Sequence, residues 1–523
     1  MKRETLKIII LSIFSIFLFI FPDILFSFFG KQYKVAFDVR SSIIVIGLGI
    51  GVALNKYRKL TIIFLILCAI LQLIQFAHIA YFGKHMAPYT LYMLSHEIED
   101  VFNESSNMIG RFWWIFPVVI LPFYGLYLCN KINKTKTKIA GLVLAGAICY
   151  TVLTERTKLE FEVNESRFTI ANSIRSTAGY VILWHIKKPT ITNYEPYIIN
   201  KKKQNDVEPI TIVYILGESC SYKHMSLYGY KRDTTPRLKD LSRDENFFFT
   251  EGVSSAVETL SASKFSMNII REPDNVKEYL LKSVNLFKLA KNNGFKTFYI
   301  SAQSSRLLAS ISGVEYIDFK ETRALPMTPA RLKRDEYLID LAKELDLSDR
   351  NFIVIHQGCM HSPYKDNYGS DVTDHNKFSG SEEPLIDDYD NVMLYNDYII
   401  SEIFKIFNKQ KSGKFYIVFA SDHSEALWEN GNFGHGHLHP DVAEIPIMAQ
   451  SNDKEFINKV KSIVKPNHYE LGLLIANIMG YDIINPNNKD NSFFICGCDP
   501  TGHAGNLKYI KVKENNSIQF VPQ

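Results

Sequence analysis

The feature that most constrains this 523-residue chain is a group of five strongly apolar windows before residue 155. They cover residues 6–29, about 37–54, 60–82, 113–129 and 139–153. A helix rising about 1.5 Å per residue needs roughly 20 residues to cross a hydrocarbon layer of ~30 Å, a length that the first and third windows reach. The others are shorter, but none of the five shows an amphipathic stripe. We therefore expect an N-terminal five-helix transmembrane domain over residues 1–155.

The basic residues set the expected orientation of these helices. Lys and Arg gather at residues 2–7, 56–59 and 131–138, which fall on one side, and the opposite loops carry fewer. The positive-inside rule assigns the richer side to the cytoplasm, so five crossings leave everything after residue 155 outside. The first window lacks a cleavage site of small residues and is expected to stay as an anchor. The net charge of +4 is small and gives no indication of nucleic-acid binding.

The rest of the chain divides into a linker and a larger domain. Residues 156–207 are mixed and charged and predict a linker. A helix near 164–186 would either rest on the bilayer as an interfacial amphipathic helix or pack on the globular domain. Over residues 208–523, short apolar runs alternate with amphipathic segments, which predicts an α/β domain with a mostly parallel central sheet covered on both faces. Ligands of such sheets collect beyond the carboxyl ends of the strands.

Acids and imidazoles recur at these strand ends. Glu218 follows the apolar run "ITIVYILG", His361 follows "NFIVIHQ", and Asp422 and His423 follow "KFYIVFAS". One His or loop Glu alone is usually an ordinary solvated residue, but Asp, Glu and His together are the ligand set of zinc or manganese. The sequence therefore predicts a metal site at this rim. Three further histidines stand in "GNFGHGHLHP": His435, His437 and His439.

A segment dense in hydroxyls, "EGVSSAVETLSASKFSMN", supplies candidate nucleophiles. A helix is expected to begin after Thr259, so an anion could sit over its free N–H groups. A hydroxyl at that point could bind zinc as an alkoxide. The alternative is that these residues are helix N-caps. The residue pattern alone does not choose among Ser254, Ser255, Thr259, Ser261 and Ser263.

Taken together, several motifs resemble the phosphoethanolamine transferases of Gram-negative inner membranes, which belong to the alkaline phosphatase and sulfatase superfamily. They are the five-helix start, "GES" at the first strand end, "SLYGYKRDTTPRL", "SSAVETLSAS", "MHSPY" and "SDHSEALWENGNFGHGH". The resemblance implies a multi-pass inner-membrane protein with its catalytic domain in the periplasm. We expect it to be a monomer.

The resemblance also implies roles for single residues. The metal-binding Glu of the family falls on Glu218, its phosphorylated Thr on Thr259, and its Asp-His ligand pair on Asp422 and His423. Two further family histidines fall on His361, in "HSP" where the family has "HGP", and on His435. These two are implied to contact substrate or a second metal ion. The resemblance leaves His437 and His439 unassigned, and either could contact substrate or a second ion.

The implied reaction is a two-step displacement with one or two zinc ions, or manganese. Thr259 attacks the phosphorus of phosphatidylethanolamine, diacylglycerol leaves, and an acceptor then takes phosphoethanolamine from the phosphothreonine. The acceptor would be lipid A, a lipooligosaccharide core sugar, another glycan or a protein. The family segment that contacts the lipid headgroup corresponds to residues 81–105, whose polar residues match poorly. Headgroup candidates there are Ser95, His96, Glu97 and Glu99.

One further departure from the family, the cysteine pairing and two alternatives remain open at this stage. The nucleophile loop lacks the cysteine that the family carries there, and the pairing of the outer cysteines cannot be deduced, although an oxidising compartment permits disulfides. They are Cys220, Cys359, Cys496 and Cys498. One alternative is a glycerophosphotransferase resembling lipoteichoic acid synthase. The other is an inactive binding ectodomain on a membrane anchor.

Overall fold

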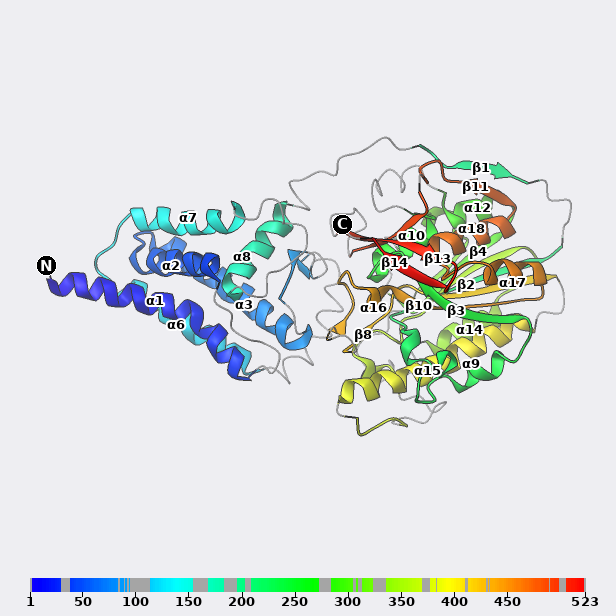
Figure 1. Ribbon diagram of the computed structural model, residues 1–523, viewed down its shortest axis with the longest axis horizontal. Helices are drawn as coiled ribbons and strands as arrows, with labels where there is room; N and C mark the ends of the chain where they lie inside the picture. Colours follow the sequence, from blue (N-terminus) through cyan, green and yellow to red (C-terminus); the bar gives the residue numbers. More distant parts are fainter. Residues whose placement is uncertain are drawn as a thin grey trace. The chain divides into compact units, whose positions relative to one another are not determined.

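Figure 1 shows the computed structural model of the chain, which divides into two compact units, Met1–Lys188 and Pro189–Gln523. The structure describes residues 2–29, 38–82, 85–88, 90–91, 94, 113–153, 168–182, 195–202, 208–271, 284–303, 307–308, 313–322, 335–368, 377–381, 383–409, 413–428, 431, 433–488, 490–497 and 505–521. Ser95, His96, Glu97, Glu99 and Cys498 lie outside these residues.

Each of the five apolar windows forms a helix in the first unit: α1 (Lys2–Phe29), α2 (Val39–Leu54), α3 (Arg58–Phe82), α6 (Ile115–Ile132) and α7 (Ile139–Leu153). Among the described helices, three are long and apolar enough to cross a membrane, namely α1, α3 and α6. The helices α2 and α7 are apolar but shorter. The structure thus supports membrane-type helices at the N-terminus, whereas five complete crossings are not established.

Close helix packing in this unit centres on the glycines of α2. A Cβ placed on Gly51 would lie 2.8 Å from Cβ of Leu144 on α7, and one on Gly49 would lie 2.6 Å from a side-chain carbon of Ile16 on α1. Both distances are shorter than real Cβ contacts, so only glycine lets the three helices approach this closely.

The helix expected near 164–186 is α8 (Thr169–Tyr180), which packs against α3 and α7. Its N-terminus is held by Asp23 of α1, whose carboxylate accepts hydrogen bonds from the backbone N–H and the hydroxyl of Thr169, both at 2.9 Å. The first two turns of α8 are buried in the unit. This short helix is therefore part of the bundle core.

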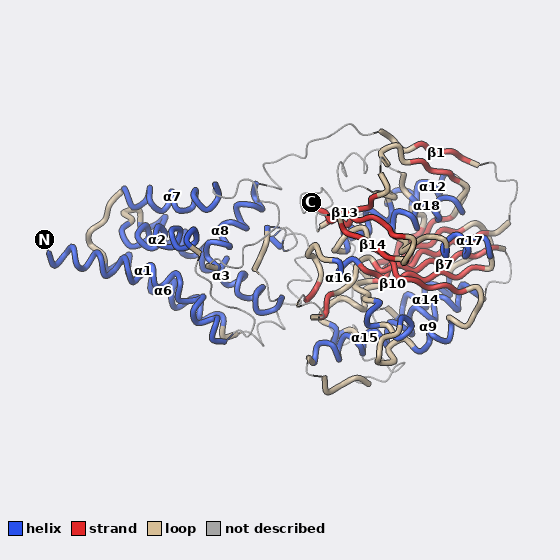
Figure 2. Tube along the Cα trace, viewed as in Figure 1, coloured by secondary structure: helices blue, strands red, loops and turns tan. Residues whose placement is uncertain are grey.

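A seven-stranded sheet forms the centre of the second unit (Figure 2). Its strand order is β3-β10-β7-β2-β6-β4-β5. The strands are β2 (Ile210–Gly217), β3 (Phe247–Val253), β4 (Lys296–Ser301), β5 (Phe319–Thr322), β6 (Asn351–His356), β7 (Lys414–Ser421) and β10 (Glu444–Ser451). Neighbours from β7 to β5 pair in parallel, but β10 pairs antiparallel with both β7 and β3. The sheet is therefore mixed, and the expectation of a mostly parallel sheet is confirmed only in part.

Helices cover both faces of this sheet (Figure 1). On one face lie α10 (Thr259–Met267), α12 (Leu286–Asn292) and α18 (His468–Ile478), which share a hydrophobic core with β2, β6 and β7. On the other face lie α9 (Pro236–Leu241), α14 (Glu336–Glu344) and α15 (Pro384–Asn408). Because both faces are covered, the central strands are continuous apolar runs, and β2 is buried along almost its whole length.

The smaller elements of the second unit lie around this core. They are the pairs β1 (Ile198–Lys201) with β11 (Tyr481–Ile484) and β8 (Ala426–Leu427) with β9 (Phe433–Gly434), the sheet of β12 (Ser492–Cys496), β13 (Asn506–Val512) and β14 (Ser517–Phe520), and the helices α16 (Pro440–Ala443) and α17 (Lys454–Lys461). Short 3-10 helices cover Tyr222–His224, Ser226–Tyr228, Val314–Tyr316 and Tyr364–Asp366.

Candidate metal centre

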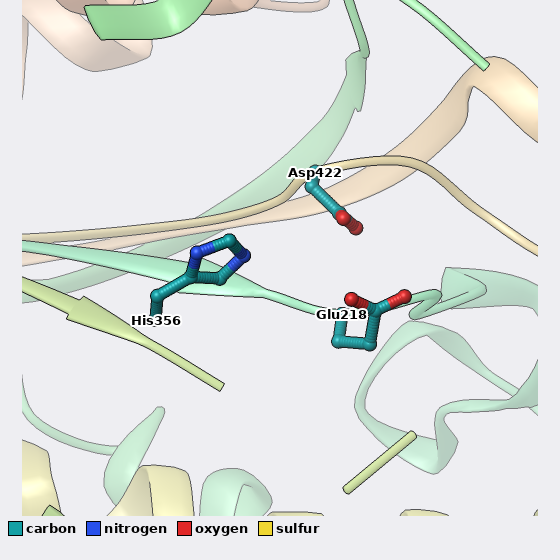
Figure 3. A group of neighbouring side chains, drawn as sticks. All are labelled: Glu218, His356 and Asp422. Atoms are coloured by element: carbon teal, nitrogen blue, oxygen red, sulfur yellow. The ribbon is translucent and has the colours of Figure 1, made fainter. Parts of the chain in front are cut away.

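Three adjacent parallel strands bring acids and an imidazole to one rim of the sheet. Glu218 follows β2 directly, Asp422 follows β7, and His356 is the last residue of β6. Because β2 lies between β7 and β6, these three side chains point into the same space (Figure 3). One ligand atom from each lies within 4.8 Å of the others, and all three residues are buried.

Two further predicted residues join this group. The hydroxyl of Thr259, at the start of α10, lies 3.2 Å from Nε2 of His423 and donates to Oε2 of Glu218 at 3.4 Å. Nε2 of His423 is 3.6 Å from Oε1 of Glu218 and 3.5 Å from Oδ2 of Asp422. Thr259 is half-buried, whereas the three residues around its hydroxyl are fully buried. The structure thus brings Glu218, Thr259, Asp422 and His423 together.

Backbone and side-chain donors hold the two carboxylates in place. Oδ1 of Asp422 accepts the backbone N–H groups of His423 at 2.6 Å and Ser219 at 3.1 Å. Its other oxygen, Oδ2, is buried and accepts no hydrogen bond from the described residues. Each oxygen of Glu218 accepts one short side-chain bond, from the Ser219 hydroxyl at 2.7 Å and from Nε2 of Gln303 at 2.5 Å.

His356 was not predicted as a site residue. It ends the apolar run "NFIVIH" and therefore looks in the sequence like part of a buried strand, whereas the expected histidine of this loop was His361. Nδ1 of His356 lies 3.0 Å from the hydroxyl of Tyr299, which is buried in β4. An ion at the rim would therefore have to meet Nε2. The signal available in the sequence was a histidine at a strand's last position.

The electrostatics of this group suit a cation. Burial raises the pKa of Asp422 to about 6, and burial together with the charge of Asp422 raises the pKa of Glu218. Burial also lowers the pKa of His423 to about 4, so its ring is neutral at pH 7. Two buried carboxylates beside the neutral ring of His423 leave excess negative charge that a divalent ion would offset, and carboxylate oxygen with imidazole nitrogen is a donor set of zinc. The residues present therefore fit a metal ion.

The remaining predicted histidines fall into two groups. The ring of His435 lies 4.4 Å from that of His423 and 5.8 Å from that of His361, measured between centroids, so these two border the centre. Nδ1 of His435 contacts Oε2 of the fully buried Glu425 at 3.0 Å. Glu425 was also missed by the sequence analysis.

His437 and His439 belong to the second group. Nδ1 of His437 lies 3.4 Å from the carbonyl oxygen of His435, and its ring centroid is 6.3 Å from that of His439. His439 caps α16, since its Nδ1 accepts the backbone N–H of Asp441. The structure thus gives His439 a structural contact at a helix end.

The start of α10 corrects one expectation about the hydroxyl-rich segment. The free N–H groups of Leu260 and Ser261 do not await an anion, because the buried carboxylate of Glu258 accepts both, at 2.7 and 2.6 Å. Among the described contacts of these five hydroxyls, that of Thr259 reaches side chains of the acid-imidazole group, Glu218 and His423. The Ser254 hydroxyl faces two backbone carbonyl oxygens, that of Ala256 at 2.6 Å and that of Asp422. The hydroxyls of Ser261 and Ser263 are buried without a hydrogen-bond partner among the described residues.

A family model matches the part of the second unit that contains the seven-stranded sheet. Residues 210–464, from β2 to just beyond α17, match the family model described as Sulfatase. This stretch is therefore similar to the sulfatase family, and the cluster described above lies at the carboxyl rim of the sheet within it.

Two of the relatives that the chain matches in sequence are phosphoethanolamine transferases. The chain is 28% identical over 256 residues to phosphoethanolamine transferase EptC of Escherichia coli O18:K1:H7, covering 45% of this chain and 43% of that protein. It is 27% identical over 266 residues to phosphoethanolamine transferase EptA of Helicobacter pylori, covering 46% and 48%. The match thus spans less than half the length of these relatives.

A solved structure extends the likeness over both units. The integral membrane protein lipooligosaccharide phosphoethanolamine transferase A (EptA) of Neisseria meningitidis matches with a TM-score of 0.60 at 16% identity, covering 93% of this chain and 97% of that one. At this identity the likeness concerns the fold, which combines N-terminal helices with a sulfatase-type domain.

Proposed function

We propose that this protein transfers phosphoethanolamine from phosphatidylethanolamine to an acceptor in the bacterial cell envelope. The observation that carries the proposal is the position of the Thr259 hydroxyl, 3.2 Å from His423 and 3.4 Å from Glu218, in a domain whose curated relatives are phosphoethanolamine transferases. A half-buried hydroxyl among fully buried acids and imidazoles is where a nucleophile can meet a substrate and still be activated.

The metal would be held by Glu218, Asp422 and His423 around the Thr259 hydroxyl, with His356 as a further ligand. Zinc, as one ion or two, or manganese would supply positive charge to the phosphoryl group there and would lower the pKa of the hydroxyl. The rigid strand ends that carry these residues keep them in position without reorganisation during the reaction.

In the first step, Thr259 Oγ1 forms a bond to the phosphorus of the donor while the bond from phosphorus to the diacylglycerol oxygen breaks. The electron pair leaves with that oxygen, which takes up a proton, and the proton of the Thr259 hydroxyl is released. In the second step, an acceptor hydroxyl or phosphate oxygen forms a bond to the same phosphorus while the bond from phosphorus to Thr259 Oγ1 breaks. The electron pair leaves with Oγ1, which takes up a proton, and an acceptor hydroxyl releases its own. We assign to His361, His435 and His437 contacts with the phosphate or a second ion, or protonation of the leaving oxygen.

The proposal places residues 1–155 in the inner membrane and residues 208–523 in the periplasm, joined by the linker 156–207. Both the donor and diacylglycerol reside in the bilayer, so tethering the domain raises their effective concentration at the site. The acceptor is lipid A, a lipooligosaccharide core sugar, another glycan or a protein, and the protein acts as a monomer.

The test uses the full-length protein in detergent micelles with phosphatidylethanolamine labelled in the ethanolamine. We expect label on Thr259 of the wild type, release of diacylglycerol, and loss of both in Thr259→Ala. Ser261→Ala is the matched control, because it removes a partnerless hydroxyl from the same helix. If Thr259→Ala retains transfer, the covalent step is wrong, and if phosphatidylglycerol is the donor instead, the protein is a glycerophosphotransferase. A wild type inactive with both lipids would indicate a binding domain.

A further inference from the structure

Gln303 reaches the candidate metal centre from a fourth strand. It lies two residues beyond β4, the strand on the far side of β6 from β2. Its side-chain Nε2 donates to Oε2 of Glu218 at 2.5 Å and to the backbone carbonyl of Gln357 at 2.8 Å. Gln357 directly follows His356 in the chain. One amide group thus joins the ends of β4, β6 and β2.

These two contacts fix which way the amide points. An amide nitrogen carries two hydrogens, and here each has an oxygen acceptor. The reversed amide would place its own oxygen against a carboxylate and a carbonyl, which repel it. Gln303 is anchored from behind as well, since its backbone N–H donates to the Ser301 hydroxyl at 2.9 Å.

The contact restrains the rotation of the Glu218 carboxylate. Gln303 holds Oε2, which also faces the Thr259 hydroxyl at 3.4 Å, and Ser219 holds Oε1, which faces Nε2 of His423 at 3.6 Å. A carboxylate with both oxygens hydrogen-bonded cannot turn without breaking a bond. Because the amide is neutral, it orients Glu218 without cancelling the negative charge that would attract a metal ion.

We propose that Gln303 is a positioning residue of the metal centre, which orients the Glu218 carboxylate toward a bound divalent cation and ties it to the strand end that carries His356. The proposal rests on the proposed function only in so far as that function requires a metal at Glu218. Partners of this kind, which bond to a ligand and not to the metal, typically change metal affinity by about 10- to 100-fold.

The test measures zinc affinity of the full-length protein by competition with a chelating indicator, and thermal unfolding of the metal-free form. In Gln303→Leu, which keeps the volume but removes the donor, we expect zinc affinity to fall by about 10- to 100-fold. Gln450→Leu is the matched control, because Nε2 of Gln450 donates to Oδ2 of Asp244 at 2.9 Å, away from the centre. Both variants lose an amide-carboxylate bond, but only the first should bind zinc more weakly.

A structural role alone would lower the unfolding temperature of both metal-free variants and leave their zinc affinities equal to that of the wild type. That result would overturn the proposal. If Gln303→Leu does not fold, Gln303→Asn keeps the amide on a side chain one methylene shorter, and it too should bind zinc more weakly. An unchanged affinity in that variant would count against the proposal equally.

The failure of this proposal can be separated from a failure of the proposed function. If the wild type transfers phosphoethanolamine and Gln303→Leu binds zinc as tightly as the wild type, only the positioning role is wrong. If Gln303→Leu weakens zinc binding but the wild type does not use phosphatidylethanolamine, the positioning role stands and the proposed reaction fails.

Discussion

The Thr259 hydroxyl lies 3.2 Å from Nε2 of His423, although 164 positions of the chain separate the two residues. Helix α10 carries the first and the end of β7 carries the second. Strand β10 lies between β3 and β7 and runs antiparallel to both, so β3 and β7 run in the same direction. The segment that leads from β3 to α10 therefore starts at the same rim of the sheet where β7 ends. The one reversed strand of the sheet therefore helps to place the hydroxyl at the rim.

Two replacements of Thr259, one without a hydroxyl and one that keeps it, test whether this hydroxyl reacts. Thr259→Ala should lower kcat for headgroup transfer by on the order of 10³-fold or more, since an enzyme without its nucleophile keeps only binding and electrostatic effects. Thr259→Ser keeps a hydroxyl and should retain part of the activity. Steady-state release of diacylglycerol measures both. Equal activity of the Ala and Ser variants would mean that the hydroxyl does not react.

The contact between Tyr299 and His356 gives a second prediction. Tyr299→Phe removes the hydroxyl at 3.0 Å from Nδ1 of His356, and a buried ring nitrogen that loses its partner costs about 1–3 kcal/mol. If His356 is a ligand, zinc affinity should fall by roughly 10-fold, as measured by chelator competition. Tyr214→Phe is the control, because the equally buried Tyr214 hydroxyl contacts Ser266 at 2.6 Å. Equal zinc affinities in the two variants would remove His356 from the ligand set.

Strand ends were predictable from the sequence because apolar runs stop where polar residues begin. Glu218, Asp422 and His423 each follow such a run, and the parallel pairing of β2 with β7 brings them together. Thr259 could not be distinguished from its neighbouring hydroxyls by pattern, since all five lie just before α10 or within its first two turns. The resemblance to a family selected it, and the structure places it beside the acids.

Two residues of the site were not predicted, because their contacts depend on the order of the strands in the sheet, which cannot be read from the sequence pattern. His356 is the last residue of an apolar strand and is therefore not recognisable as a site residue in the sequence. Gln303 reaches Glu218 because β4 lies beside β6. Glu258 was missed for another reason, since its carboxylate caps the helix where the free N–H groups suggested an anion site. The sequence before this helix is compatible both with a capping side chain and with a bound anion. The position of the Glu258 side chain shows that it is a cap.

A third prediction concerns pH and His468, at the start of α18. Its Nδ1 accepts the Ser255 N–H at 3.3 Å and its Nε2 donates to the Ser421 carbonyl at 2.9 Å, so the folded protein holds a neutral ring. Burial lowers its pKa to about 4 from the ordinary value of 6.5. The stability it contributes is therefore fully present above about pH 6.5 and is lost as the pH falls toward 4.

Thermal unfolding of the metal-free protein between pH 7.5 and 4.5 measures this effect. The wild type should lose on the order of 3 kcal/mol from this one group over that interval. His468→Gln should be less stable at pH 7.5 but should show a shallower dependence on pH. Parallel curves for the two proteins would mean that protonation of His468 does not drive the acid destabilisation.

The final prediction concerns the packing of α2 in the first unit. In Gly51→Val the new Cβ would lie 2.8 Å from Cβ of Leu144 and 3.0 Å from its Cα, so the backbone of α7 has to move. Overpacking of this kind costs about 1–3 kcal/mol, and unfolding in detergent should occur at a lower temperature. Gly146→Ala, on α7, is the control, because a Cβ there meets nothing within 4 Å. If Gly51→Val unfolds at the temperature of Gly146→Ala, α2 and α7 do not pack as closely as this arrangement requires, and the helix bundle needs a different core.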